Sequence, residues 1–294
     1  MRHPSPKLVL YGGLLLAGVL TPIIAYLFRN PSAPPDGRLH IRYRITIQNT
    51  TNRPILGTEL QVGVPLKNTS TQSRIEINAD HPFTVIPRDN PQQSLLFKWD
   101  KIPPYTTKVV SIQSALEIWH KARPQENNQL GDFLKPEHFI ESDNADILAL
   151  AHQLQAGDVL KTARTIFNWV AANISYNGYI RRTRGAAYAY KYHQGDCTEY
   201  AYLFVALCRA NGIPARPVAG FVCSQSAVLD LGDYHNWAEF YADGRWRIAD
   251  PQRKIFLPDP AAYIAFRIIR PSIDGDGNLV SGIKGTGLRV RLNS

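Results

Sequence analysis

The segment from Tyr234 to Gln252 constrains the fold more strongly than any other part of this 294-residue chain. It reads YHNWAEFYADGRWRIADPQ, two alternating runs on either side of an Asp-Gly pair. Asp243 and Gly244 suit the central positions of a type I′ turn, which requires positive φ at both. The pattern therefore predicts a two-residue β-hairpin, and counting outward from the turn fixes which residues pair.

This register places a histidine beside an acid. Counting back from the turn pairs Trp237 with Asp250, so His235 and Asp250 become diagonal neighbours on one face of the sheet. Diagonal Cα atoms lie about 7–8 Å apart, close enough for an imidazole–carboxylate hydrogen bond. Pro251 cannot donate to the ladder and should end the second strand. Each residue alone is more often structural, and it is their predicted proximity that favours a catalytic role.

Cys197 is predicted to lie in the first turn of a helix that ends at Gly212. Apolar residues follow it at helical spacing, namely Ala201, Phe204, Val205 and Cys208. The free N–H groups and the positive end of the helix dipole favour a thiolate, which is the nucleophilic form of cysteine. A lone cysteine is more often a small buried hydrophobe, and that interpretation is retained for Cys208 and Cys223.

A thiol, an imidazole and a carboxylate together can perform nucleophilic acyl transfer. In this arrangement Cys197 attacks an amide carbonyl, His235 takes and returns the proton, and Asp250 orients the imidazole. The resulting thioester passes to water in a peptidase or amidase, or to an amine in a transglutaminase. The sequence does not distinguish the two, because the difference depends on which acceptor the pocket admits.

Three further residues are candidates for contacts with the substrate. Backbone N–H groups at the helix start, including that of Cys197, are expected to stabilise the oxyanion. Gln194 and Trp169 are the candidate side-chain donors. Trp237, on the same strand face as His235, is a candidate wall of the acyl pocket, although a role in the core fits the pattern equally well.

The chain before this region alternates with a period of two. Ile41, Tyr43, Ile45 and Ile47 alternate with polar residues, and further short strands are expected near 59–64, 74–77, 83–86, 95–99 and 108–113. Short strands separated by turn signals are typical of a β-sandwich. Helical spacing follows from Ile147, and Asp158 is placed to cap a second helix. Residues 179–195 are expected to form a loop.

Residues Leu8 to Phe28 contain no charged side chain and are long enough to cross a bilayer as a helix. Soluble core helices rarely lack a polar face, and the apolar region of a cleaved signal peptide is usually only about 7–15 residues. We therefore expect an uncleaved, single-pass membrane anchor. A preceding tail this short usually stays inside, so the remainder of the chain is expected to be extracytoplasmic.

The formal net charge of +9 suits an acidic partner, such as an anionic membrane surface or an acidic glycopolymer. The densest basic run, Arg181, Arg182 and Arg184, lacks the interleaved aromatic residues of a single-strand binding groove, so no nucleic acid is expected. The three cysteines form no C-x-x-C pair, and the Asp274–Asn278 run lacks the glycine of a calcium loop. We expect no metal and no cofactor.

These observations predict six parts. They are a tail and transmembrane anchor at 1–29, a Pro-rich spacer at 30–37, a β-sandwich at 38–118, a linker at 119–140, a catalytic domain at 141–260 and a C-terminal extension at 261–294.

The catalytic part resembles the transglutaminase-like superfamily, which includes cysteine protease-like domains. The stretches GDCTEYAYLFVALCRANGIPARPVAGF and YHNWAEFYADGRWRIADPQ carry a cysteine at a helix start, a Gly-Ile-Pro-Ala-Arg run, a histidine that opens a strand and an aspartate before proline. The resemblance covers residues 145–255. Asn236 departs from it, because the family usually has alanine or another small residue there.

The resemblance implies an α+β fold with a papain-like or transglutaminase-like core, in which helices pack on an antiparallel sheet. It also implies that Cys197, His235 and Asp250 form a catalytic triad in a bacterial-type, membrane-anchored enzyme acting on a protein, peptide or other amide. Two alternatives stay open: a non-catalytic binding or scaffolding protein of the cell envelope, and an adhesion or assembly protein led by the sandwich.

Overall fold

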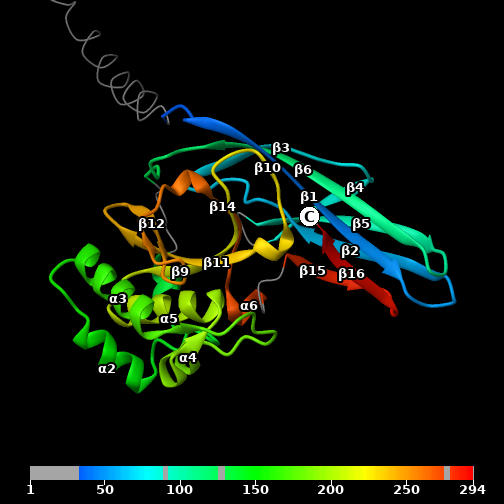
Figure 1. Cartoon of the computed structure of the whole chain (residues 1–294). Coiled ribbons are helices and arrows are strands. Elements are labelled where there is room, and N and C mark those ends of the chain that lie inside the picture. Colours follow the sequence, from blue (N-terminus) through cyan, green and yellow to red (C-terminus); the bar gives the residue numbers. More distant parts are fainter. Residues whose placement is uncertain (1–32, 89–91, 125–129, 275–278, 294) are drawn as a thin grey trace, which may run out of the picture. The chain divides into compact units, whose positions relative to one another are not determined.

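The computed structural model describes residues 33–88, 92–124, 130–274 and 279–293, and those from Pro35 onward cluster as a single unit (Figure 1). The predicted membrane anchor at residues 8–28 lies outside the described residues, as does most of the acidic run 274–278. Within the described ranges, no helix is both long and apolar enough to cross a membrane.

Two sheets face each other in the part of the chain expected to be a sandwich (Figure 1). One runs in the order β10 (Ala227–Val228), β1 (Gly37–Asn49), β6 (Thr107–Ile118) and β3 (Gln72–Ala79), and β16 (Leu288–Asn293) also pairs with β1. The other runs β15 (Val280–Lys284), β2 (Ile55–Gly63), β5 (Gln93–Ile102) and β4 (Phe83–Pro87). All six segments expected to be strands are strands.

Period-two alternation explains why the sheets face one another. Tyr43 and Ile45 of β1 are fully buried, whereas the alternating residues Arg42 and Arg44 are exposed. The buried set packs against Leu60 of β2 and Phe97 of β5. Burying each large apolar side chain contributes about 1.5–3 kcal/mol, so the two inner faces stabilise each other.

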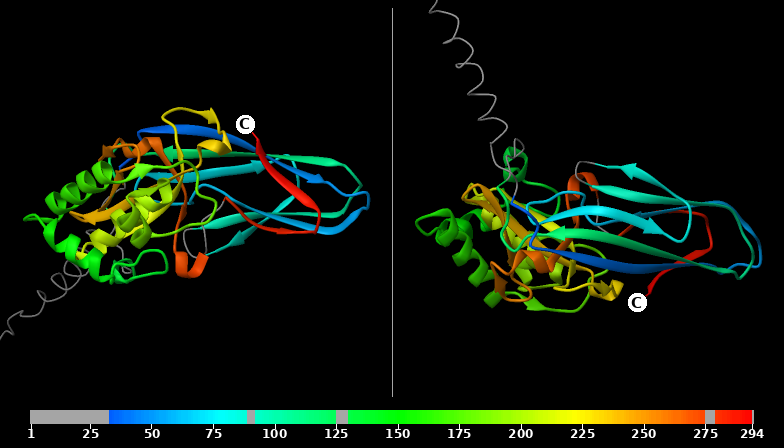
Figure 2. Two further views of the ribbon diagram at one scale, coloured as in Figure 1. Left: turned by 60° about the horizontal axis from the view of Figure 1, so that its bottom comes forward. Right: turned by 90° about the horizontal axis from the view of Figure 1, so that it is seen from above.

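The part of the chain expected to be catalytic, called the catalytic part below, is built on a third sheet. This sheet is antiparallel and has five strands. Its order is β13 (Ile255–Phe256), β12 (Arg245–Asp250), β11 (His235–Ala242), β9 (Ala215–Val222) and β14 (Tyr263–Ile268). The helices α2 (Ala145–Gln153), α3 (Val159–Asn173), α4 (Ala186–Tyr192) and α5 (Cys197–Ala210) gather on one face of this sheet (Figures 1 and 2). The fold is therefore mixed α+β, as expected.

Short elements connect these layers. They are η1 (Leu130–Leu134), β7 (Ser175–Tyr176), β8 (Gln194–Gly195), η2 (Leu231–Asp233), η3 (Pro260–Ala262) and α6 (Pro271–Asp274). Residues 261–294, expected as an extension, supply β14 to the catalytic sheet and β15 and β16 to the two sandwich sheets.

The helix α5 lies at the centre of the catalytic part and packs against β11. It begins at Cys197, and Gly212 just beyond its end has φ +71°, as the sequence predicts for a helix terminus. Its start also has a capping box that the sequence analysis missed. The Asp196 carboxylate accepts from Thr198 N, and the Glu199 carboxylate accepts from Asp196 N.

The expectation of a loop throughout residues 179–195 was wrong in part, because α4 occupies Ala186–Tyr192. Its Ala186 and Ala189 are fully buried against α5, and the Glu141 carboxylate accepts from Ala187 N at 3.1 Å. Tertiary packing and a capping acid from outside the segment thus stabilise a helix too short to predict from its own pattern.

The sandwich and the catalytic sheet share packing. Phe221 of β9 and Phe266 of β14 are in edge contact at 5.1 Å between ring centroids, and Phe266 contacts Tyr43 of β1 at 5.7 Å. The side-chain amide of Gln72, at the start of β3, donates to Ala265 O at 2.9 Å and accepts from Ala265 N at 2.8 Å. This pairing imitates a strand ladder and joins the two parts.

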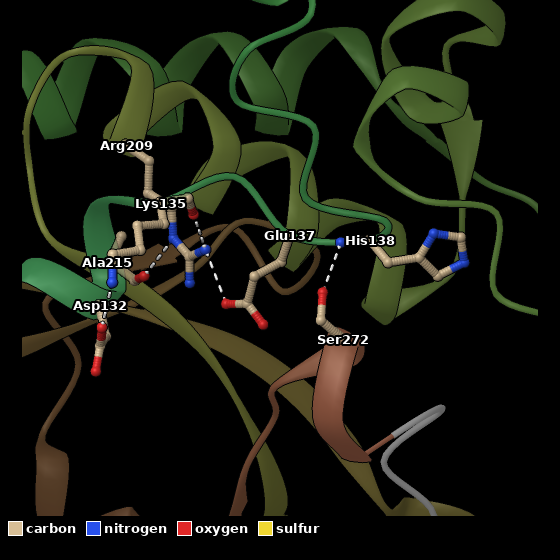
Figure 3. A network of polar contacts seen from close by, with 7 residues as sticks. All are labelled: Asp132, Lys135, Glu137, His138, Arg209, Ala215 and Ser272. Atoms are coloured by element: carbon tan, nitrogen blue, oxygen red, sulfur yellow. Dashed lines mark hydrogen bonds and ion pairs between the residues drawn. The ribbon is translucent and has the colours of Figure 1, made fainter.

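A buried ion pair fixes the far end of α5 (Figure 3). Arg209 donates to Glu137 Oε1 at 2.9 Å, and the exposed fractions of the two side chains are 0% and 7%. The guanidinium also donates to Ala215 O at 2.9 Å and Lys135 O at 2.6 Å, although Arg209 Nη2 and Glu137 Oε2 are buried without a hydrogen-bond partner. These bonds tie the expected linker to α5.

We predict that Gly220→Ala destabilises the fold by about 2–4 kcal/mol. A Cβ at residue 220 would lie 2.0 Å from the Ile264 carbonyl oxygen and 3.0 Å from the Trp237 ring, so the backbone of β14 would have to move. Thermal and urea unfolding would measure the loss. Gly131→Ala is the matched control, because its added Cβ meets nothing within 4 Å, and equal melting temperatures for the two variants would contradict the prediction.

Candidate active site

The hairpin forms in the predicted register. Ala242 pairs with Arg245 and Ala238 with Ala249, while Asp243 and Gly244 have φ of 51° and 73°. Both central residues therefore have the positive φ of a type I′ turn. The strand β12 ends at Asp250, immediately before Pro251, as expected from the missing proline N–H.

The histidine and the aspartate meet at the mouth of this hairpin. His235 Nε2 lies 2.8 Å from Asp250 Oδ2, and the Asp250 side chain is fully buried. A carboxylate only accepts hydrogen bonds, so Nε2 carries the proton of this bond. The other ring nitrogen, Nδ1, is then the atom that can exchange a proton with a nucleophile.

Cys197 occupies the first position of α5 and is half-buried. The backbone N–H of Asn236 lies near enough to lower the pKa of the thiol, and Asn236 Nδ2 donates to Thr198 Oγ1 at 2.9 Å. Two consecutive residues of the helix start thus contact the strand residue that follows His235. Cys197 and His235 thus lie where α5 meets β11, and Asp250 reaches His235 from the end of β12.

The environment of the thiol differs from the expectation of a favoured thiolate. Burial raises the pKa of Cys197 to about 12, and the carboxylates of Asp196, Asp250 and Glu199 add to the increase. The Asn236 N–H opposes this change without cancelling it. Burial first, and the nearby carboxylates second, thus disfavour the thiolate, so forming it requires a base that takes the proton.

A tyrosine that the sequence analysis missed completes the surroundings of Asp250. The Tyr263 hydroxyl donates to Asp250 Oδ2 at 3.0 Å, and Arg253 N donates to Oδ1 at 3.1 Å. Burial and the neighbouring Asp250 charge raise the pKa of Tyr263. Tyr263 lies on β14, which joins the sheet through β9, so no local pattern around the hairpin indicates its position.

The three candidate substrate residues have different surroundings. Trp237 shares the His235 face, with 6.4 Å between ring centroids, but it is 1% exposed and packs edge-on against Tyr263 at 5.1 Å. Trp237 therefore packs between the His235 ring and the Tyr263 ring as a core residue. The Trp169 ring stacks on Tyr190 of α4, with 6.2 Å between centroids.

Gln194 lies three residues before Cys197, the first residue of α5. Its Nε2 donates to the Tyr188 hydroxyl at 2.7 Å, and its Oε1 accepts from Asn177 at 3.1 Å. The amide is thus already engaged with the segment that precedes α5. Within the part of the chain that the structure describes, no three His, Cys, Asp or Glu side chains are grouped so as to hold a metal ion.

Comparisons with known proteins agree with this architecture. Residues 148–251 match the model of the transglutaminase-like superfamily. No curated protein matches the sequence. A solved structure of a candidate cysteine protease from Cytophaga hutchinsonii is 19% identical, with a TM-score of 0.59, and the match covers 87% of this chain and 92% of that one.

A second solved structure, the periplasmic domain of TgpA from Pseudomonas aeruginosa, is 16% identical, with a TM-score of 0.39. That match covers 76% of this chain and 89% of the TgpA chain. The family model spans α3, α4, α5 and the hairpin, which contain Cys197, His235 and Asp250. Residues 148–251 therefore form a transglutaminase-like domain.

Proposed function

We propose that this chain is a cysteine-dependent enzyme that transfers the acyl group of an amide through a thioester. One observation carries the proposal: a histidine held at 2.8 Å by a buried carboxylate opens the strand whose next residue, Asn236, donates to Thr198 beside Cys197. Nucleophile, base and orienting acid are the three roles that this chemistry requires. The family relationship supports the same reaction class.

The proposed reaction begins with proton transfer from the Cys197 thiol to His235 Nδ1 as the sulfur attacks the amide carbonyl carbon. The imidazolium is stabilised by Asp250 through Nε2. It then protonates the leaving amine nitrogen, and the C–N bond breaks to give a thioester. Attack by water or by an amine, with His235 as base, releases the acyl group and restores the thiol.

The oxyanion of the tetrahedral intermediate needs donors at the helix start. Thr198 N donates to Asp196 Oδ1 at 2.8 Å. The N–H of Cys197, at the first helical position, is one of the four that a helix leaves without an internal acceptor. We assign this group to the oxyanion, because it belongs to the nucleophile itself and moves with the sulfur.

We further propose that residues 8–28 anchor the enzyme in a membrane, with the catalytic part outside the cytoplasm. The support is the length of the uncharged run and the Pro-rich spacer that follows it. The substrate would be a protein, a peptide or another amide reached at the membrane surface, and a nucleic acid is not proposed. Protection of the catalytic part from protease in intact cells would contradict this orientation.

We predict that His235→Ala lowers the rate of Cys197 alkylation by iodoacetamide at pH 7 by about 100-fold. Without the imidazole, the rate should keep rising above pH 9, since burial raises the pKa of Cys197 to about 12. Peptide mass spectrometry would follow each cysteine separately, with fully buried Cys208 as the internal control. Equal rates in both proteins at pH 7 would favour a non-catalytic binding or scaffolding role.

We predict that Tyr263→Phe lowers the same rate at pH 7 by about fivefold but leaves it nearly unchanged at pH 10. Loss of the hydroxyl leaves Asp250 Oδ2 with only the His235 bond, so the imidazole is less firmly oriented. Tyr105→Phe, at a side chain that is 67% exposed, removes the same group elsewhere and should have no effect. A parallel decrease at both pH values would indicate misfolding rather than loss of positioning.

A further inference from the structure

A basic segment lies next to the proposed nucleophile. Between Asn177 and Gly195 there is no Asp or Glu, while Arg181, Arg182, Arg184 and Lys191 supply four positive charges. All four of these side chains are exposed. We call residues 177–185 the arginine loop. None of its arginines forms an ion pair within the described ranges, so their charge is available to a ligand.

The arginine loop is fastened to the residues that flank Cys197. Ile180 N donates to Asp196 Oδ2 at 2.8 Å, and Arg184 N donates to Glu199 Oε1 at 2.9 Å. Arg181 and Arg182 lie between these two attachment points. The loop entrance is also fixed, because β7 pairs in parallel with β8, directly before Asp196. The arginines are therefore held close to the start of α5.

The two acids that hold the loop do not neutralise its outer surface. Asp196 and Glu199 are 4% and 0% exposed, and each also accepts a second backbone bond within the capping box. Burial raises the pKa of Glu199. Carboxylates thus occupy the inner side of the loop, and guanidinium groups occupy the side that faces solvent.

One of the guanidinium groups is already oriented. Arg184 donates to the Tyr188 hydroxyl and lies 4.7 Å from the centre of its ring. The same hydroxyl accepts from Gln194 at 2.7 Å, and Gln194 accepts from Asn177 at 3.1 Å. This network reduces the side-chain entropy that binding an anion would otherwise cost. It also gives Gln194 a role distinct from the oxyanion donor expected from sequence.

We propose that the arginine loop is a subsite for carboxylate groups, so that the preferred substrate of the enzyme is an acidic peptide amide. The inference rests on the proposed function and adds the substrate class. Guanidinium groups match carboxylates in a bidentate geometry, and a local excess of positive charge speeds the encounter with anions. An acidic side chain bound here would deliver its neighbouring amide to the Cys197 thiol.

The test uses a pair of peptidyl chloroacetamides that differ only in carrying Glu and Asp or the isosteric Gln and Asn. The full chain is labelled at Cys197 with each, and the ratio of the two second-order rates is measured by intact mass spectrometry. We expect the acidic label to react about tenfold faster at low salt and to lose this advantage as salt rises. The ratio cancels changes in the intrinsic reactivity of the thiol.

The variant Arg181→Gln/Arg182→Gln should bring the ratio close to one, and Arg181→Glu/Arg182→Glu should invert it. The control Arg289→Gln/Arg291→Gln removes the same charge from two exposed positions on β16, in a sandwich sheet, and should keep the wild-type ratio. A wild-type ratio of one, or a ratio that survives Arg181→Gln/Arg182→Gln, would overturn the proposal.

Two other results separate the possible causes of failure. If Arg181→Gln/Arg182→Gln weakens sedimentation with anionic phospholipid vesicles while the label ratio persists, the loop binds membranes and the substrate proposal is overturned. If the ratio falls as expected but alkylation does not depend on His235, the carboxylate subsite stands and the catalytic proposal fails. If the two labels react with wild-type protein at equal rates while alkylation still depends on His235, the carboxylate subsite is overturned and the catalytic proposal stands.

Discussion

The buried helix α5, packed on β11, is the contact on which the rest of the catalytic part depends. The residues from Glu199 to Arg209 are all buried, and Phe204 contacts Phe240 of β11 at 6.0 Å between ring centroids. An apolar helix of this kind has no face that could move into water without a large free-energy cost. Its direction is therefore fixed, and so is the position of Cys197 at its first turn.

The same contact explains why two acids are buried at the start of α5. A helix start buried among other elements must satisfy its N–H groups internally, and Asp196 and Glu199 do so. Burial raises the pKa of the Cys197 thiol, and these two carboxylates add to the increase. In the proposed mechanism, the thiol is therefore neutral at rest and loses its proton only to His235.

Much of this site follows from local sequence rules. The Asp243-Gly244 turn fixes a register by counting, and the register alone predicts the His235 and Asp250 contact. The ends of α5 follow from helical spacing and a terminal glycine. These predictions succeed because every step depends on residues close together in the chain.

The parts that sequence reasoning missed depend on distant contacts. Tyr263 reaches Asp250 only because β14 pairs with β9, and α4 is stabilised by Glu141 from outside its own segment. The thiol pKa was expected to decrease because the dipole was considered without the capping acids. The predicted domain boundaries and the membrane anchor stay predictions.

The hydrogen bonds between Gln72 and Ala265 connect the sandwich to β14, the strand whose Tyr263 binds Asp250. Ala265 is two residues from Tyr263 on β14, and Tyr263 binds the oxygen of Asp250 that also holds His235. The sandwich therefore cannot pivot as a detached stalk without pulling on β14. A chain of hydrogen bonds and one short stretch of strand thus connects the sandwich to the imidazole of His235.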